Sequence, residues 1–261
     1  MNAPGYYFMK MHQERLYVIA LENADNVNGM YIDVEKNGCS FRNYKDLLLL
    51  GAIDQRTGEN EKGGCYDKLR KIAKDLYPNS KEKYHLSAQD CMTIDKIPYI
   101  GKYSDKTPNI YVATGFNKWG MTSSMVSAMI ISDMILDKEN DFSEIFSPKR
   151  FDLSLSIGNI ANDMIETAKN FIAQKIYIPS SKIEHIKNGH AGIVEYNDEK
   201  IGVYKNNDGK EFIVSTKCPH LGCQLGWNAD ELTWDCPCHG SRFDYKGRLI
   251  GSPATKDLID N

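Results

Sequence analysis

The sequence predicts an α+β protein in two parts: a mixed sheet-and-helix part over residues 1–150 and a small all-β part over residues 180–261. Short apolar or alternating runs, punctuated by Asn and Gly, fill the first fifty residues, which is typical of antiparallel strands. Two helical patterns follow before residue 150. Beyond Pro179 the apolar runs are again short and separated by turn residues, which indicates strands.

The strands of the first part are expected to form an antiparallel meander. They are predicted at residues 17–21, 29–34 and 46–52. A polar loop over residues 56–64 then leads into a helix. The apolar face of that helix consists of Tyr66, Leu69, Ile72, Ala73 and Leu76. Pro78 ends the helix, because proline cannot donate to the backbone hydrogen-bond ladder.

A second helix is expected after a strand and a glycine-bearing turn. Residues 87–101 are predicted to be extended, and residues 110–116 are predicted to form the strand. The helix is expected to begin near Thr122, and either Thr122 or Ser123 can cap it. Its body, residues 125–136, consists almost wholly of small and apolar side chains, so we expect it to be buried. A turn that opens such a helix is a natural site for an anionic or electron-rich ligand.

The second part of the chain follows a linker. Residues 151–179 contain an amphipathic stretch that predicts a linker helix packed on the first part. Strands are then predicted at residues 192–196, 201–204, 211–215 and 232–234, the first two as a hairpin. His185 and His190 lie among these strands and are interpreted as surface or turn residues.

Composition argues against several classes of function. The 261 residues carry a net charge of −3 and no long basic run, which argues against nucleic-acid binding. No apolar run reaches membrane-spanning length, and the N-terminus has no signal-peptide pattern, so we expect a cytoplasmic protein with no membrane partner. Of the seven cysteines, Cys39, Cys65 and Cys91 are scattered singly and are interpreted as core or surface thiols.

Cysteine and histidine cluster in two short segments near the C-terminus. Each segment supplies one Cys and one His: Cys218 with His220, and Cys236 with His239. Common zinc sites instead place two Cys in one segment. One Cys and one His from each segment suit a two-iron cluster in which two thiolates bind one iron and two imidazoles bind the other. A zinc knuckle, or a set of unrelated thiols, is the alternative.

These segments, Cys218-Pro-His-Leu-Gly-Cys and Cys236-Pro-Cys-His-Gly-Ser, resemble those of the Rieske [2Fe–2S] domain. The resemblance covers residues 180–261. It implies that Cys218 and Cys236 bind one iron of the cluster and that His220 and His239 bind the other. It also implies an iron–sulfur, metal-binding protein that transfers electrons.

Further positions take their roles from the same resemblance. Cys223 and Cys238 match a pair that forms a disulfide between the two loops in Rieske proteins of the respiratory type, and free thiols are the alternative in a reducing cytosol. Ser241 matches a hydroxyl that hydrogen-bonds the cluster. Phe243 stands where the highest-potential members often have Tyr, so one hydrogen bond is expected to be missing. We therefore expect a reduction potential inside the range of roughly −150 to +300 mV, and not at its top.

The first part resembles the C-terminal portion of FAD-dependent oxidoreductases of the D-amino-acid-oxidase type, over residues 5–150. The resemblance rests on the segments Asp95-Lys-Ile-Pro-Tyr-Ile-Gly and Asn109-Ile-Tyr-Val-Ala-Thr-Gly-Phe, followed by the second helix. It implies a mixed sheet-and-helix flavoprotein-like domain, followed by a small all-β Rieske domain. It also implies flavin contacts at Gly115, Trp119, Gly120, Met121 and Thr122.

The nucleotide-binding half of that family is missing from the sequence. The strand and G-x-G-x-x-G turn that hold the FAD pyrophosphate have no counterpart here. FAD is therefore a candidate cofactor that we do not expect this chain to hold alone, and a separate nucleotide-binding chain is a candidate partner. Because residues 122–136 pack on that half in the family, this helix is then expected to expose apolar surface.

Two functions remain open. In the first, a flavin-dependent oxidation of a small substrate, an amine by family resemblance, is connected through the cluster to an external electron carrier. In the second, the chain is an electron-transfer module without flavin chemistry of its own. A Rieske oxygenase is disfavoured because it needs a mononuclear iron site of two His and one carboxylate downstream, and no His follows His239. No catalytic residue is assigned.

Overall fold

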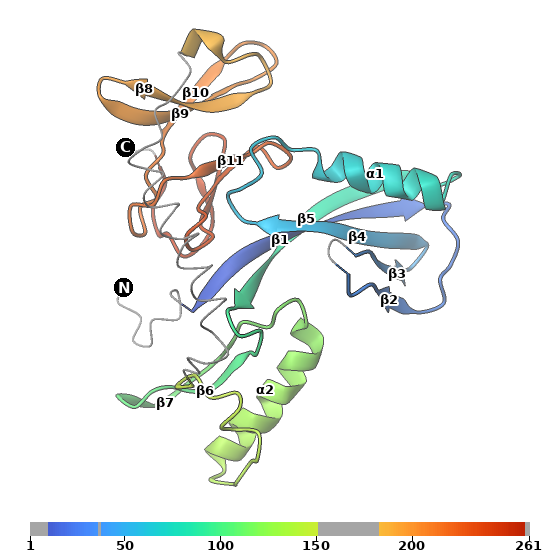
Figure 1. The fold of residues 1–261 in the computed structure, drawn as a ribbon, viewed down its shortest axis with the longest axis vertical. Helices are drawn as coiled ribbons and strands as arrows, with labels where there is room; N and C mark the ends of the chain where they lie inside the picture. The colour runs from blue at the N-terminus through green and yellow to red at the C-terminus, as the bar shows by residue number, and fades with distance from the viewer. Residues whose placement is uncertain (1–9, 36–37, 151–182, 259–261) are drawn as a thin grey trace. The chain divides into compact units, whose positions relative to one another are not determined.

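The computed structural model describes residues 10–35, 38–150 and 183–258 (Figure 1). The linker helix expected within residues 151–179 lies outside the described residues. The chain divides into two compact units. Unit 1 comprises Met1–Gln13 with Asp90–Lys169, and unit 2 comprises Glu14–Gln89 with Asn170–Asn261. Unit 2 is therefore made of two segments that are far apart in the sequence.

A five-stranded sheet forms the first layer of unit 2. Its strands lie in the order β2-β3-β4-β1-β5. Their bounds are Met11–Glu22 for β1, Met30–Ile32 for β2, Ser40–Tyr44 for β3, Leu47–Arg56 for β4 and Lys81–Thr93 for β5. β2 pairs with β3, β3 with β4 and β4 with β1, all antiparallel, which confirms the antiparallel strands. Only β2, β3 and β4 follow one another as a meander, because β1 lies beside β4 and not beside β2. The strand β3 was not predicted, because its segment Ser-Phe-Arg-Asn-Tyr is mostly polar.

Helix α1, Cys65–Leu76, covers this sheet and packs on β4 (Figure 1). It confirms the helix predicted from the spacing of apolar residues. Tyr66, Leu69 and Ala73 of its predicted face are buried in a core that also contains Tyr17 and Leu50 of the sheet. Burial of each large side chain contributes about 1.5–3 kcal/mol, so this face is what holds the helix in place.

The C-terminal domain, residues 183–258, is built of two small antiparallel sheets. The first contains β8 (Ala191–Tyr196), β9 (Glu199–Lys205) and β10 (Glu211–Ser215), in the order β10-β9-β8. The second contains β11 (Gly226–Asn228), β12 (Thr233–Asp235), β13 (Arg242–Asp244) and β14 (Leu249–Gly251). A short 3₁₀ turn, Ile183–His185, precedes them. Trp234 and Phe243, both fully buried, lie at the centre of the core.

These strands confirm the hairpin β8–β9 and the strands β10 and β12 that the sequence predicts. The three-residue strands β11, β13 and β14 were not predicted, since they are too short to show an alternating pattern. His185 and His190 are exposed, as expected.

Among its described residues, unit 1 contains a two-stranded sheet and one long helix. β6 (Tyr99–Ser104) pairs antiparallel with β7 (Thr107–Thr114), and α2 (Gly120–Ile135) packs on both. Neither Thr122 nor Ser123 caps α2, whose N-cap is Trp119. No helix in the described parts of the chain has the length and apolar character needed to cross a membrane.

The expectation that the body of α2 is buried was wrong for this chain. Only Ser123, Ser127 and Ile130 are buried, whereas Met125 and Met129 are more than half exposed. The helix is apolar almost all around, and the β6–β7 hairpin covers only one narrow stripe of it. The other expectation, that this helix presents apolar surface, is confirmed.

Within unit 2 a carboxylate of the C-terminal domain caps the helix that covers the five-stranded sheet. Gly64, the N-cap of α1, makes no side-chain cap of its own. Asp230 supplies one instead: its carboxylate accepts hydrogen bonds from Gly64 N at 3.1 Å and Cys65 N at 3.0 Å. It also accepts one from the Asn60 amide at 2.8 Å. A negative charge at a helix N-terminus is favoured by the helix dipole.

We predict that Asp230→Ala lowers the free energy of unfolding by about 2 kcal/mol, because α1 loses its cap and the Asn60 amide loses an acceptor. Urea unfolding followed by circular dichroism measures the change. Asp67→Ala is the matched control, because Asp67 lies in the first turn of the same helix but is 79% exposed and pairs only with Arg70. Equal losses in both variants would contradict the cap.

Candidate metal centre

Two loops of the C-terminal domain have the same backbone structure. The first loop, Cys218–Cys223, follows β10, and the second loop, Cys236–Ser241, connects β12 to β13. In the first loop Cys218 N donates to Cys223 O and Gly222 N donates to Cys218 O, both at 2.8 Å. In the second loop Cys236 N donates to Ser241 O and Gly240 N donates to Cys236 O, again both at 2.8 Å. Each loop is thus a tight turn closed at the same two positions.

A glycine occupies the same left-handed position in each loop. Gly222 has φ +78° and Gly240 has φ +79°. Residues with a β-carbon are strained in this region of backbone space, so glycine is the residue that closes these turns at the lowest cost. The recurring Cys-Pro and Gly positions in the sequence therefore encode one turn used twice.

The loops bring two imidazoles together. The rings of His220 and His239 are nearly perpendicular, with centroids 4.9 Å apart. Burial lowers the pKa of both, and His220 lowers that of His239 further, to about 4. Both rings are therefore neutral at pH 7, the form that offers a lone pair to a metal. The Nδ1 atom of His220 is buried without a hydrogen-bond partner among the described residues, as a metal-binding nitrogen would be.

The same loops bring two thiols together. Cys218 and Cys236 are 2% and 0% exposed, and neither is in a disulfide. The pKa of Cys218 is lowered, chiefly because the Cys236 thiol donates a hydrogen bond to its sulfur. The hydroxyl of Ser241 also contributes to lowering the pKa of Cys218. The pKa of Cys236 is raised by the same interaction and by burial. Such stabilisation of a thiolate favours a metal ligand.

A second pair of cysteines connects the two loops. The structure joins Cys223 and Cys238 by a disulfide, with their Cα atoms 6.6 Å apart. The sulfur atoms of Cys223, Cys236 and Cys238 lie within 4.8 Å of one another. Because two of these sulfurs are joined to each other, this group does not supply three metal ligands.

Ser241 is held by its surroundings. It is fully buried, and its hydroxyl accepts a hydrogen bond from Ala254 N at 2.9 Å. That bond leaves the hydroxyl proton free to point at the Cys218 sulfur. Phe243, two residues on, is fully buried in the core.

The donor set fits a [2Fe–2S] cluster with mixed ligands. Two buried thiols and two neutral imidazoles approach from matched loops, which is the donor set of a centre with sulfur on one iron and nitrogen on the other. Pairing of one Cys with one His in each loop differs from the common zinc arrangements. The four predicted ligands, Cys218, His220, Cys236 and His239, are thus brought together by the fold.

The fold and these loops define an iron–sulfur protein of the Rieske class. Residues 177–260 match the Rieske [2Fe-2S] domain, which carries a [2Fe–2S] cluster. Residues 1–134 match the family described as FAD dependent oxidoreductase, and the chain belongs to that family. The chain therefore combines a domain of the FAD dependent oxidoreductase family with a Rieske domain.

The chain is similar to two relatives and to one solved structure over parts of their lengths. YhfW of Bacillus subtilis, named as a Rieske 2Fe-2S iron–sulfur protein, is 38% identical over 97% of this chain and 51% of its own length. The cytochrome b6-f complex iron–sulfur subunit of Synechococcus elongatus is 30% identical over 38% of this chain and 50% of that subunit. The chain thus spans about half the length of these relatives. Glycine oxidase from Geobacillus kaustophilus is 20% identical, with a TM-score of 0.47 over 55% of this chain and 40% of that one.

The predicted flavin contacts lie together at the start of α2. Gly115 has φ +71°, and a β-carbon there would meet Thr93 Cγ2 at 2.2 Å, so the turn needs glycine. After it, Trp119, Gly120, Met121 and Thr122 are exposed. The Asn117 side chain fixes the turn by accepting hydrogen bonds from Thr93 and donating one to Gly115 O. The structure thus presents one ordered, exposed strand-to-helix turn.

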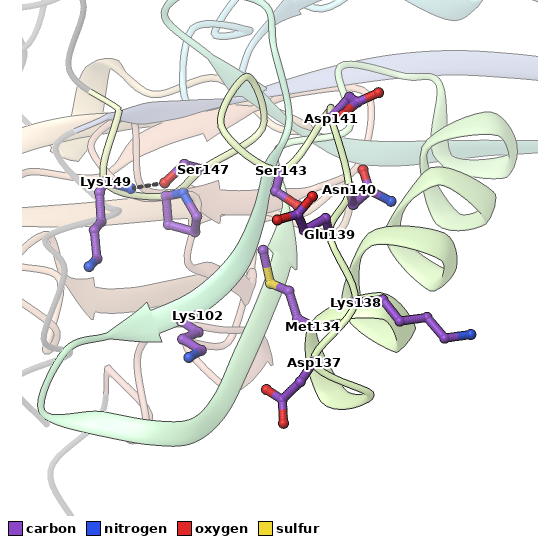
Figure 2. Close-up of a pocket in the computed structure, with 11 residues that line it drawn as sticks. Lys102, Met134, Asp137, Lys138, Glu139, Asn140, Asp141, Ser143, Ser147 and Lys149 are labelled. Atoms are coloured by element: carbon purple, nitrogen blue, oxygen red, sulfur yellow. Dashed lines mark hydrogen bonds between the residues drawn. The ribbon is translucent and has the colours of Figure 1, made fainter.

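A separate cavity of about 660 Å³ lies in unit 1, lined by β6, the end of α2 and the segment that follows it. Figure 2 shows Lys102 and Lys149 on one side of it and Asp137, Glu139 and Asp141 on the other. None of the predicted flavin contacts lines it.

Sequence reasoning missed the residues that hold the second loop from outside. Gln89 Nε2 donates to Gly240 O at 3.0 Å. Gly58, in the turn after β4, lies so close to Pro237 that a β-carbon would be 2.8 Å from its nitrogen. Gly58 is also in close contact with Gly226, because a β-carbon on Gly226 would be 2.1 Å from Gly58 O. No motif marks these residues, and only their partners in the fold give them a role.

We predict that Gly58→Ala destabilises the protein by about 1–3 kcal/mol and perturbs the spectrum of the iron centre. The new methyl group clashes with Pro237 in the second loop, and φ is +86° at this residue. Gly209→Ala is the control, because Gly209 has φ +82° but its β-carbon would meet nothing closer than 3.8 Å. Urea unfolding and the visible spectrum measure both variants. If Gly209→Ala changes the spectrum as much, the close contact is not the cause.

Proposed function

We propose that Cys218 and Cys236 bind one iron of the [2Fe–2S] cluster and that His220 and His239 bind the other. The observation that carries this assignment is the repeat of one turn in two loops, each presenting a buried thiol and a neutral imidazole. Neutral imidazoles in place of two thiolates reduce the negative charge around the irons, so the centre is easier to reduce than one with four cysteines.

Ser241 and the disulfide belong to the same proposal. The Ser241 hydroxyl would donate a hydrogen bond to the sulfur of Cys218, whose pKa it helps to lower, and such hydrogen bonds raise the potential by stabilising the reduced cluster. The Cys223–Cys238 disulfide holds the two loops in the relative position that the cluster needs. We place the protein in the cytoplasm, which the free thiols Cys39, Cys65 and Cys91 support. A disulfide is unusual in that compartment, and this one would persist there because both of its cysteines are buried in the cluster loops.

The finer function proposed is electron transfer between a flavin-dependent oxidation of a small substrate, an amine by family, and an external carrier. Membership of the flavoprotein family and a Rieske domain in one chain supports it. Bound flavin would take two electrons from a substrate and release them one at a time. Gly115, Trp119, Gly120, Met121 and Thr122 would lie against the flavin ring, and the rest of the FAD site would come from a further segment or a partner chain.

A second candidate is an electron-transfer module with no flavin chemistry on this chain. The exposed start of α2 is the feature that separates the two candidates, because only the first needs it to contact a cofactor. Titration of the purified chain with FAD, followed by flavin absorbance and fluorescence, distinguishes them. If the chain binds FAD stoichiometrically and Gly120→Trp abolishes that binding, the result supports the flavoenzyme. If the chain binds no FAD, the result supports the electron-transfer module or an enzyme completed by another chain.

The cluster ligands are tested by optical and EPR spectra of the purified chain before and after dithionite. We predict broad visible bands that bleach on reduction, and an EPR signal typical of mixed nitrogen and sulfur ligation. Cys218→Ser and His220→Ala each lose this signal and most of the iron. The controls Cys39→Ser and His190→Ala keep both, because these residues lie outside the loops. Zinc in place of iron, or a signal retained in both ligand variants, would overturn the assignment.

A further inference from the structure

One side chain of the five-stranded sheet contacts the backbone of the second loop. Gln89, near the end of β5, donates a hydrogen bond from its side-chain amide to Gly240 O at 3.0 Å. Gly240 is buried and lies between His239 and Ser241. Gln89 therefore binds the loop next to a proposed iron ligand without contacting that ligand itself.

The orientation of the Gln89 amide is fixed by its other end. Its Oε1 atom accepts hydrogen bonds from Thr57 Oγ1 and from Arg15 Nη2, both at 3.1 Å. Arg15 and Thr57 are each 2% exposed, and a second guanidinium nitrogen of Arg15 donates to Ser87 Oγ at 2.6 Å. Because two donors face one end of the amide and a carbonyl faces the other, only one of the two amide orientations satisfies all three contacts.

This anchor distinguishes two loops that are otherwise alike. In each loop the glycine N–H closes the turn internally, to Cys218 O in the first and to Cys236 O in the second. Gly222, at the matching place in the first loop, is exposed, whereas the Gly240 carbonyl is held by the sheet. The position of the second loop is thus set from outside as well as from within.

The peptide that Gln89 holds leads directly to the Ser241 hydroxyl. The Gly240 carbonyl belongs to the peptide that joins Gly240 to Ser241, and the buried Ser241 hydroxyl accepts a hydrogen bond from Ala254 N and helps to lower the pKa of the Cys218 thiol. Movement of this peptide would change the position of the Ser241 hydroxyl relative to the Cys218 sulfur and the orientation of His239. Hydrogen bonds to the sulfurs and the exposure of the cluster set the potential of such centres.

We propose that Gln89 is a positioning residue for the iron–sulfur centre. By holding the Gly240 carbonyl, Gln89 helps to set the reduction potential of the cluster. The proposal rests on the proposed cluster ligands. It assigns a function in electron transfer to the sheet of the flavoprotein family domain, through the network of Arg15, Thr57 and Gln89.

Gln89→Glu tests the proposal in the full chain. The carboxylate keeps the length of the side chain and still accepts hydrogen bonds from Arg15 and Thr57, but it places an oxygen opposite Gly240 O. The loop loses its anchor and gains a nearby negative charge, and both effects favour the oxidised cluster. We expect unchanged iron content, altered EPR g-values and a lower midpoint potential, with the reduced-to-oxidised ratio at the wild-type midpoint falling by about fivefold or more. Gln89→Ala, which adds no charge, shifts the potential in the same direction by less.

Gln13→Glu is the matched control. It makes the same chemical change on β1, where the Gln13 amide donates to Cys91 Sγ and not to a cluster loop. Its potential and EPR spectrum should equal those of the wild type. A wild-type chain without the mixed-ligand signal would overturn the proposed function and this inference with it. A normal wild-type signal that neither Gln89 variant changes, even with a lower melting temperature, would overturn this inference alone and leave Gln89 a structural residue.

Discussion

A network of hydrogen bonds between buried polar side chains of unit 2 joins the five-stranded sheet to the C-terminal domain. Asn60, 5% exposed, places its amide nitrogen within hydrogen-bond distance of three acceptors, Tyr17 OH, Asn228 Oδ1 and Asp230 Oδ2, at 2.8–3.0 Å. Asn228 continues the network by donating to Asp235, which is fully buried beside a proposed cluster ligand. An unpaired buried polar group costs about 1–3 kcal/mol, so separation of the two layers would leave several such costs at once.

This constraint places the iron–sulfur loops on a rigid support. A domain of this size buries only a modest core, and its two sheets are short. The cap of α1 by Asp230, the contact of Gly58 with Pro237 and the bond from Gln89 to Gly240 add fixed points from the larger sheet. A centre whose potential depends on hydrogen bonds to sulfur benefits from such support, because small movements of the loops change those bonds.

The sequence predicted the parts of the fold whose signal is local. Helix α1 follows from apolar residues at helical spacing, and the hairpin β8–β9 follows from alternation around a turn. The strands β11, β13 and β14 escaped prediction because three residues carry no periodicity. The burial of α2 was predicted wrongly because an apolar sequence shows what a helix can pack against and not what is there to cover it.

Local sequence alone predicted the donor set of the centre. Each of two short loops contains a Cys, a His two or three residues later and a Gly four residues after the Cys, so the turn and the proposed donor atoms are specified within one short segment each time. Tertiary structure alone decided what holds the loops: Asp230 caps a helix 165 positions away, and Gln89 binds a carbonyl 151 positions away. Such pairs leave no periodic or spacing signal in one sequence, because their geometry exists only after the sheet and the C-terminal domain have packed together.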